Sequence, residues 1–406
     1  MATVLRIPLV GADGTESGLT HTVIGGDLLP VEPVVDYLQF LRDTESSPNT
    51  VAAYARGLAA WWTVLEHSEH TWEDFPVGMF GVFLNYLRTG DLPGVTRVGE
   101  VQEPPAKSTV ALRAAAVHAF YRFHADTNGL HGPYQRLYST RGKRGRSQYQ
   151  GMLTGVGRAK DKPRPVFTVR NPAAAMTPIL VPAQVRAILD GCSTWDGRRW
   201  SGSESALRDR LLFAVLVETG MRIGEALSLR HCDFHAGTGQ TPWIDVEARQ
   251  DHPHGERTKS GRPRRIFIGD DLESLYSAYV WQLVDRGVDL EVPDLASHFV
   301  FVNLAGGKLF EPMRVESVYS KIRSLKSRPE LQLPPRWSPH WLRHTHATAL
   351  LLAGAPPHMV MRRLGHLDMQ TTVNTYGWVT EDAELRSIGD WHNFTAGWKG
   401  LHNGHA

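Results

Sequence analysis

The sequence predicts an α+β fold that is mostly α-helical, with an N-terminal helical domain and a C-terminal domain that adds a small antiparallel β-sheet to its helices. Apolar residues recur at helical spacing through most of the chain from Leu28 onward, whereas the only β-rich part spans residues 243–268. A basic stretch with little periodicity, residues 131–170, separates the two domains. With 406 residues, the chain is long enough for two domains with cores of their own.

Composition places the chain among ordinary soluble globular proteins, since 42% of its residues are apolar and 21% are charged. No apolar run is long enough to span a membrane, and the N-terminus lacks the apolar core and cleavage site of a secretion signal. Cys192 and Cys232 are the only cysteines and provide no disulfide framework. We therefore expect a reduced, cytoplasmic protein.

The N-terminal part is expected to consist of a short extension followed by a helical domain. The extension, residues 1–27, contains one strand-like piece and turn residues but no recognisable chemistry. In the domain, residues 28–130, Ser47 and Pro48 mark a helix start as N-cap and first helical residue. Helices are expected at residues 34–41, 48–65, 77–87 and 108–125.

Residues 131–177 are expected to link the two domains, and much of this segment is basic. Ten Lys or Arg and one acid lie between residues 131 and 170, although the net charge of the whole chain is only +2. Such a block attracts phosphate groups; a solvated, self-repelling linker is the alternative. The candidates for contact with nucleic acid are Arg141, Lys143, Arg144, Arg146, Arg158, Lys160, Lys162 and Arg164.

The second domain is expected over residues 178–379. Gly220 stands where a helix C-terminus requires glycine. Residues 299–302 are predicted to form another short strand or a buried extended segment. Helices are expected at residues 182–189, 205–218, 272–286 and 315–325, and paired strands at residues 243–248 and 264–268 with a turn at 260–263.

The stretch around which the second domain is organised runs from Ser338 to Trp378. Ser338 and Pro339 are predicted to begin a helix, as its N-cap and its first residue. His340 and Arg343 are three residues apart, so they project from the same face of that helix.

A second short helix is predicted from His358 to Leu364, with Gly365 ending it. His366 is then left at its C-terminal end, and Tyr376 follows after a short amphipathic piece. The whole stretch therefore offers two histidines, an arginine and a tyrosine at helix edges, a set that suits phosphoryl transfer.

These residues resemble the tyrosine recombinase (phage integrase) family, whose C-terminal pattern is His-x-x-Arg, then Leu-Gly-His, then a Tyr. In this chain the pattern reads His340-Trp-Leu-Arg343, Leu364-Gly365-His366 and Tyr376.

Further parts of the family pattern lie upstream in the expected order. Residues 219–229 match the box that holds the first catalytic Arg, which falls on Arg222. Residues 258–268 match the hairpin that holds the catalytic Lys, which falls on Lys259. Residues 47–58 resemble, more loosely, the N-terminal core-binding domain of the same family.

The resemblance implies that the chain transfers a DNA phosphodiester to a protein hydroxyl. Arg222 and Arg343 would clamp the non-bridging oxygens, because a guanidinium meets two phosphate oxygens and keeps its charge. Lys259 would protonate the leaving 5′-oxygen as general acid. Tyr376 would be the nucleophile and would form a covalent 3′-phosphotyrosine.

Two histidines and a glutamate would assist this reaction. His340 would accept the tyrosine proton or steady the phosphate. His366 would hydrogen-bond a non-bridging oxygen; a helix-end histidine stabilised by the helix dipole is the alternative. Glu225, three residues after Arg222, would hold Arg222 through an ion pair or would be an ordinary surface acid.

No metal ion or other cofactor is expected. His340 and His344 have the i, i+4 spacing of a zinc helix, and His346 completes a His-Thr-His run. However, no general-base Glu lies between them, and the chemistry of the family requires no metal. Cys232 lies in a His-Cys-Asp-Phe-His run, but the sequence has no second Cys/His cluster at zinc-site spacing.

The resemblance also implies an assembly: the two domains close around duplex DNA as a clamp, and a homo-tetramer holds paired recombination sites through a Holliday junction. A monomer or weaker oligomer is expected without DNA. Residues 380–406, with Trp391, Phe394 and Trp398, would dock on a neighbouring protomer or pack on their own domain.

Trp378 departs from the family pattern, since many family members have His at this position.

The expected function is site-specific DNA recombination for the integration, excision or transposition of a mobile element. The long basic linker differs from the most compact chromosome-resolving recombinases, which are one alternative. The others are a type IB topoisomerase-like enzyme, a metal-dependent nuclease and a catalytically silent DNA-binding partner subunit. The sequence does not reveal which DNA sequence is the target, because that depends on contacts with the bases. It also does not reveal whether an accessory protein or partner recombinase is needed.

Overall fold

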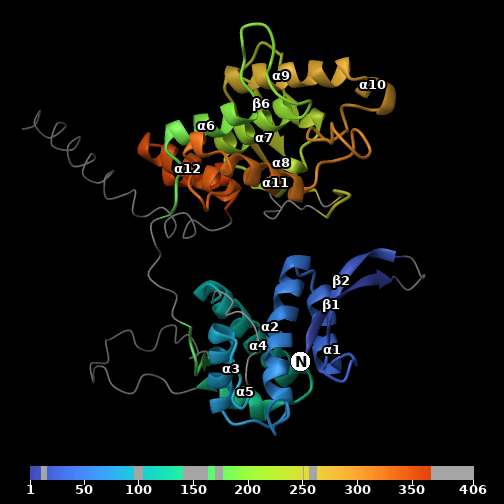
Figure 1. Ribbon diagram of the computed structural model, residues 1–406, viewed down its shortest axis with the longest axis vertical. Helices are drawn as coiled ribbons and strands as arrows, with labels where there is room; N and C mark the ends of the chain where they lie inside the picture. Colours follow the sequence, from blue (N-terminus) through green and yellow to red (C-terminus); the bar gives the residue numbers. More distant parts are fainter. Residues whose placement is uncertain are drawn as a thin grey trace, which may run out of the picture. The chain divides into compact units, whose positions relative to one another are not determined.

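The chain forms two compact units, Met1–Ala173 and Ala174–Ala406, in a computed structural model (Figure 1). The described part is mostly helical with small antiparallel sheets, which confirms the predicted fold class. Within it, no helix combines the length and the apolar character that crossing a membrane would need. The structure describes residues 1–10, 16–95, 104–139, 163–169, 177–249, 251–255 and 263–366, with only the backbone for residues 10 and 16–18.

The N-terminal unit is built on helices that pack around buried aromatic rings. Ser47 caps α2 as predicted, because its side chain accepts a 3.2 Å hydrogen bond from the backbone N–H of Thr50. Trp61 is fully buried, and its Nε1 donates to the hydroxyl of Tyr121 at 3.0 Å. The helices are α1 (Glu32–Asp43), α2 (Pro48–Glu66), α3 (Gly78–Thr89), α4 (Lys107–Thr127) and α5 (His131–Leu137).

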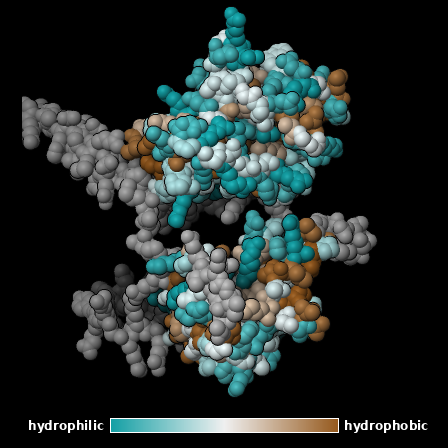
Figure 2. All heavy atoms as spheres, in the orientation of Figure 1, coloured by the Kyte–Doolittle hydropathy of each residue, from teal (hydrophilic) through white to brown (hydrophobic). Residues whose placement is uncertain are grey.

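A β-hairpin precedes these helices and packs on α1 and α2. Its strands are β1 (Thr3–Val10) and β2 (Glu16–Ile24), and Val23 lies in the core of the unit. The strand-like piece of the sequence corresponds to β1, whereas β2 was not predicted, because Gly and Thr interrupt its apolar alternation. Figure 2 shows apolar side chains over this hairpin, and the exposed ones include Leu5 and Leu19.

The segment predicted to be linker begins as folded structure. Residues 131–137 form α5, and Leu137 and Tyr138 are buried in the core of the N-terminal unit. Strands β3 (Tyr138–Ser139) and β4 (Arg164–Pro165) then pair in antiparallel fashion. Burial of these two apolar side chains stabilises a short helix that the weak periodicity of the sequence did not indicate.

The C-terminal unit is organised around α7, which packs against α6, α9 and α12. Leu211, Leu212, Val215 and Leu216 of α7 are all buried, so the helix is covered on several sides. Short 3₁₀ helices lie at His231–Asp233 and Pro329–Leu331. The helices are α6 (Pro182–Cys192), α7 (Ala206–Thr219), α8 (Ile223–Leu227), α9 (Asp270–Asp285), α10 (Val288–Glu291), α11 (Val315–Lys326), α12 (Pro339–Leu352) and α13 (Pro357–Leu364).

A three-stranded antiparallel sheet of order β5-β6-β7 completes this unit, with β5 at Phe234–His235, β6 at Trp243–Val246 and β7 at Arg264–Phe267. The pairing of β6 with β7 was predicted, whereas the two-residue strand β5 was not. Residues 299–302 are a buried extended segment with isolated bridges to Arg230 and Pro312, one of the two predicted forms.

Candidate active site

The turn after α7 determines where Arg222 lies. Gly220 ends α7 in the left-handed conformation, with φ of 66°. A Cβ at this position would lie 2.6 Å from Cδ2 of His346 and 2.8 Å from Cδ2 of Leu364, so only glycine fits. Arg222 follows as the N-cap residue of α8. The close approach of this turn to α12 and α13 therefore places Arg222 beside both helices.

Glu225, on α8, holds Arg222. Its carboxylate accepts a 2.9 Å hydrogen bond from the backbone N–H of Arg222 and a 3.0 Å bond from Nη1 of the same residue. The side chain of Glu225 is 0% exposed and that of Arg222 is 26% exposed. Glu225 is therefore a buried anchor, and the guanidinium that it holds reaches the surface.

Arg264, which sequence reasoning missed, is a second partner of Glu225. Its Nη2 donates to Oε2 of Glu225 at 2.7 Å, and its side chain is only 4% exposed. A usable signal was present in the sequence: β7 alternates, so Arg264 takes the buried register and Arg265 the exposed one. A buried arginine requires a partner.

The Glu225 carboxylate is ionised at neutral pH. Burial raises its pKa, but the charges and hydrogen bonds of Arg264, together with those of Arg222, lower it further than burial raises it. The net pKa of Glu225 is below its usual value. The two guanidinium groups therefore share one buried negative charge.

Arg343, on α12, joins the two turns of the site. It is 2% exposed; its Nη1 donates to the carbonyl oxygen of Gly220 and its Nη2 to that of Leu364, both at 2.7 Å. One guanidinium thus binds the end of α7, just before Arg222, and the end of α13, just before His366. The planar fork of arginine suits this bridging role.

The start of α12 differs in one detail from the prediction. Pro339 is the first helical residue and Ser338 occupies the N-cap position, both as expected. The side chain of Ser338, however, makes no capping hydrogen bond. Pro339 lacks an N–H, so one of the donors that a cap would serve is already absent.

His366 lies where Gly365 ends α13 in a left-handed conformation, with φ of 67°. The pKa of His366 is lowered to about 4, first by burial and then by positive neighbours. Those neighbours, in decreasing order of effect, are Arg343, Arg222, His340 and Arg264. Three of the six expected catalytic residues, Arg222, His340 and Arg343, therefore lie near enough to a fourth, His366, to lower its pKa.

His340 and His344 continue this group along α12. His340 is exposed, and its ring centroid lies 4.3 Å from that of His344. The pKa of His344 is lowered to about 4 by burial and then by His340, Arg343 and His366. A neutral imidazole beside Arg343 can donate an N–H to a phosphate oxygen without adding a further charge.

His346 has a structural role in the same helix. Its Nε2 accepts a 3.0 Å hydrogen bond from Nε of Arg363, and its pKa is lowered to about 3, mainly by burial. Because that ring nitrogen accepts a hydrogen bond, it cannot also bind a metal. Across the described residues, no group of three or more His, Cys, Asp or Glu side chains is arranged to hold a metal ion.

Several expected site residues lie outside the described residues. Lys259 belongs to the gap at residues 256–262, and Tyr376 and the tail at 380–406 follow the last described residue, His366. Of the expected DNA contacts only Arg164 is described; it is exposed on β4. The others that lie outside are Arg141, Lys143, Arg144, Arg146, Arg158, Lys160 and Lys162.

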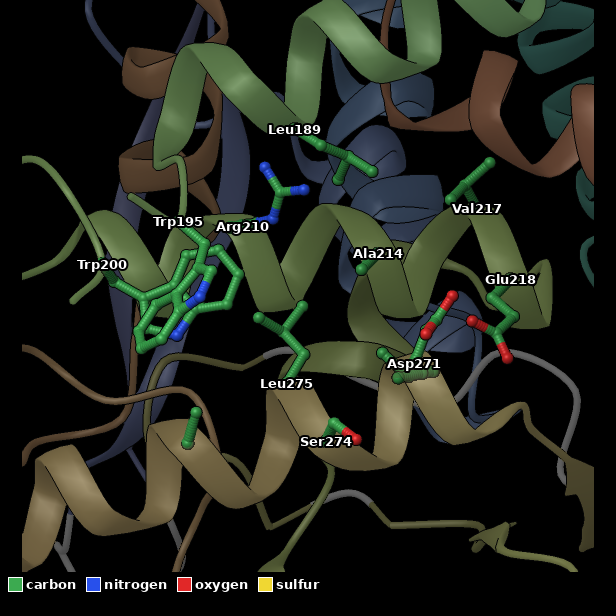
Figure 3. A pocket seen from close by; sticks show the side chains of 12 residues that line it. Leu189, Trp195, Trp200, Arg210, Ala214, Val217, Glu218, Asp271, Ser274 and Leu275 are labelled. Atoms are coloured by element: carbon green, nitrogen blue, oxygen red, sulfur yellow. The ribbon is translucent and has the colours of Figure 1, made fainter. Parts of the chain in front are cut away.

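A pocket of about 630 Å³ lies elsewhere in the C-terminal unit, between α6, α7 and α9. Figure 3 shows Trp195 and Trp200 together at one end and the carboxylates of Glu218 and Asp271 facing one another at the other. None of the expected catalytic residues that the structure describes lines this pocket. The candidate active site is instead a cationic surface around Arg222 and His340, which suits a large polyanion better than a small molecule.

Two models of known protein families match the chain. The model of the "Phage integrase family" matches residues 179–382, and that of "Phage integrase, N-terminal SAM-like domain" matches residues 34–128.

Two relatives span most of the chain. Transposase A from transposon Tn554 of Staphylococcus aureus is 28% identical over 349 residues, which cover 85% of this chain and 87% of the relative. Tyrosine recombinase XerD of Mycobacterium tuberculosis is 27% identical over 377 residues, which cover 92% and 97%.

Solved structures show the same fold at lower identity. The Tn1549 transposon integrase in complex with transposon right end DNA has a TM-score of 0.52 at 17% identity, covering 88% of this chain and 99% of that one. The XerH site-specific recombinase in a post-cleavage complex has a TM-score of 0.54 at 17% identity, covering 84% and 80%.

Proposed function

Because the chain belongs to the phage integrase family of tyrosine recombinases, enzymes that cleave and rejoin DNA, we propose that it recombines the ends of a mobile genetic element. The observation that carries the chemistry is the pair of hydrogen bonds from Arg343 to the carbonyl oxygens of Gly220 and Leu364, which hold together the turns that lead to Arg222 and His366. A cationic cluster around a neutral imidazole suits the non-bridging oxygens of a phosphodiester in its transition state.

In the proposed reaction, the hydroxyl of Tyr376 attacks a DNA phosphorus atom and forms a 3′-phosphotyrosine, while the 5′-oxygen leaves. Lys259 gives the leaving oxygen its proton. The tyrosine proton passes to His340, whose exposed ring is accessible to substrate. Rejoining is the reverse, with a 5′-hydroxyl of the partner strand as nucleophile, so no outside energy source is required.

Arg222 and His366 bind the non-bridging oxygens, and Arg343 completes the electrostatic clamp. Glu225 holds the Arg222 guanidinium, and yet 26% of the Arg222 side chain is exposed, which suits a group that is positioned before the substrate arrives. Arg343 is more deeply buried, so its positive charge acts on the phosphate while its hydrogen bonds hold the turns beside Arg222 and His366.

The proposed substrate is double-stranded DNA, with the basic segment 141–164 along the phosphate backbone. The structures of relatives that contain recombination-site or transposon-end DNA support this substrate class. We further propose a homo-tetramer on paired sites, a tail at 380–406 that docks between protomers, and action in the cytoplasm, where such DNA is accessible.

The similarity to Transposase A from transposon Tn554 and the long basic segment favour a mobile element. The match to XerD, which covers 92% of the chain, favours a second candidate function, the resolution of chromosome dimers. The two functions share the chemistry and differ in the DNA sites used, so a test of the biological role must compare DNA sites.

The test is a recombination assay on plasmids that carry either the ends of the DNA element surrounding the gene or the chromosomal dimer-resolution site. We expect a circular excision product from the element ends, formed in the presence of a chelator. Recombination only at the chromosomal site would establish the second function. Relaxation of a plasmid without either site would indicate a topoisomerase. Binding of DNA without cleavage would indicate a catalytically silent partner subunit.

A further inference from the structure

Arg264 occupies the inward-facing position at the start of β7, at the centre of the hydrogen-bond network beneath the candidate active site. Its side chain is 4% exposed, whereas the next residue, Arg265, is 51% exposed and pairs with Asp245 on the outer face of the sheet. The two neighbouring arginines thus have opposite environments, which follows from the alternation of a strand.

The guanidinium of Arg264 connects two parts of the site that are distant in sequence. Its Nη2 donates to Oε2 of Glu225 at 2.7 Å, and its Nε donates to the backbone carbonyl oxygen of Arg363 at 2.8 Å. Glu225 holds Arg222, and Arg363 lies in the last turn of α13, which leads to His366. A single side chain therefore links the supports of Arg222 and His366.

Arg264 is poorly placed to bind a phosphate itself. It is nearly inaccessible, and its donors point to a buried carboxylate and a helix-end carbonyl. Arg222, which shares Glu225 with it, has 26% of its side chain exposed. Arg222 is therefore the arginine that can reach a phosphate, whereas Arg264 is buried and supports the site.

We propose that Arg264 is a positioning residue of the active site, which fixes Arg222 and His366 relative to each other. The proposal rests on the function proposed above and adds a residue to it. Without Arg264, the Glu225 carboxylate loses one of the cations that neutralise it, so it attracts the Arg222 guanidinium more strongly and draws it inward, away from the phosphate. The carbonyl of Arg363 also loses its donor, so the end of α13 can move.

The test compares Arg264→Gln and Arg264→Lys with the matched control Arg265→Gln in the full-length protein. The substrate is duplex DNA carrying a recombination site with a nick beside the cleavage position, which traps the covalent adduct. The readouts are the thermal midpoint, the Kd for DNA and the single-turnover rate of adduct formation at saturating DNA. NMR of the arginine Nε–Hε groups without DNA reports independently on Arg222.

Arg264→Gln is expected to slow adduct formation about 10²-fold at saturating DNA with an unchanged Kd, because loss of alignment affects the chemical step. Arg264→Lys restores part of the rate, since an ammonium can neutralise Glu225 but cannot also serve the Arg363 carbonyl. Arg265→Gln keeps the wild-type rate. A purely structural role would instead lower the thermal midpoint and leave the rate of the folded fraction unchanged.

The inference is overturned if folded Arg264→Gln forms the adduct as fast as Arg265→Gln. If Arg264→Gln does not fold, Arg264→Lys decides: a wild-type rate overturns the inference and a reduced rate supports it. If the wild-type protein forms no adduct, the proposed function fails. The NMR signal of the Arg222 Nε–Hε group then decides whether Arg264 positions Arg222. A signal unchanged in Arg264→Lys overturns the positioning role, whereas a shifted signal supports it.

Discussion

The guanidinium of Arg343 donates a 2.7 Å hydrogen bond to the carbonyl oxygen of Gly220, which connects α12 to the turn at the end of α7. The same guanidinium binds the carbonyl oxygen of Leu364 at the end of α13, also at 2.7 Å. The residue that the family pattern marks as a phosphate clamp is therefore also a structural link. Its charge and its hydrogen bonds serve the same site.

Replacing Arg343 by Lys is expected to destabilise the C-terminal unit, because an ammonium cannot reach both carbonyls. One buried carbonyl left without a donor costs about 1–3 kcal/mol in the free energy of unfolding. Chemical denaturation measures this loss. The control is Arg362→Lys, an exposed arginine of α13, which should leave the free energy of unfolding unchanged. Equal stability of the two variants would contradict the bridging role.

Replacing Gly220 by Ala is expected to cost more than the same change at Gly237. Both glycines have positive φ, 66° and 71°, so each substitution places a side chain in a left-handed backbone at about 1–2 kcal/mol. Only at Gly220 would the new Cβ meet His346 and Leu364, which adds about 1–3 kcal/mol of overpacking. Thermal unfolding of the two variants gives the difference. A Gly220 variant no less stable than the Gly237 variant would refute the close-packing argument.

His366 is expected to stay neutral far below the usual pH range of histidine. Burial and the neighbouring arginines hold its pKa at about 4 in the folded protein, against about 6.5 in an unfolded chain. The unfolded chain therefore takes up the proton first, so this residue contributes stability above pH 6.5 that is lost as the pH falls towards 4. NMR titration of the ring protons measures the midpoint; a midpoint near 6.5 in the folded protein would contradict the described surroundings.

DNA binding is expected to depend on salt through the basic segment. Replacing Arg141, Lys143, Arg144 and Arg146 by Gln should lower the slope of log K against log salt by about 0.9 for each phosphate that the variant no longer neutralises. Fluorescence anisotropy over a series of salt concentrations measures the slope. The control is the exposed pair Arg198 and Arg199, between α6 and α7, whose replacement should leave the slope unchanged. An unchanged slope in the quadruple variant would remove this segment from the DNA interface.

Sequence reasoning succeeded where local patterns determine the structure. The start of α2 at Pro48 follows from Ser47 and its side-chain cap, and the end of α13 follows from Gly365. The ion pair of Glu225 with Arg222 was one of two interpretations of the sequence, the other being an ordinary surface acid, and the structure shows the pair. In each case, the interacting groups are neighbours in sequence.

Features that depend on distant contacts escaped prediction. Helix α5 forms because Leu137 enters the core of the N-terminal unit, which its weak periodicity did not indicate. Arg264 meets Glu225 across 39 residues, and only the tertiary fold brings these two residues together. The sequence pattern marked the candidate phosphate-binding groups. The strand alternation indicated that Arg264 is buried, but its partners, the Glu225 carboxylate and the Arg363 carbonyl, were recognisable only from the folded structure.

The central claim is that Tyr376 attacks DNA within the site formed by Arg222, His340, Arg343 and His366. The most direct measurement incubates the protein, with chelator present, with its recombination site carrying a nick just beyond the cleavage position. We expect a covalent protein–DNA adduct that disappears in Tyr376→Phe, while that variant still binds the DNA. An adduct that persists in Tyr376→Phe would show that another residue is the nucleophile and would contradict the account.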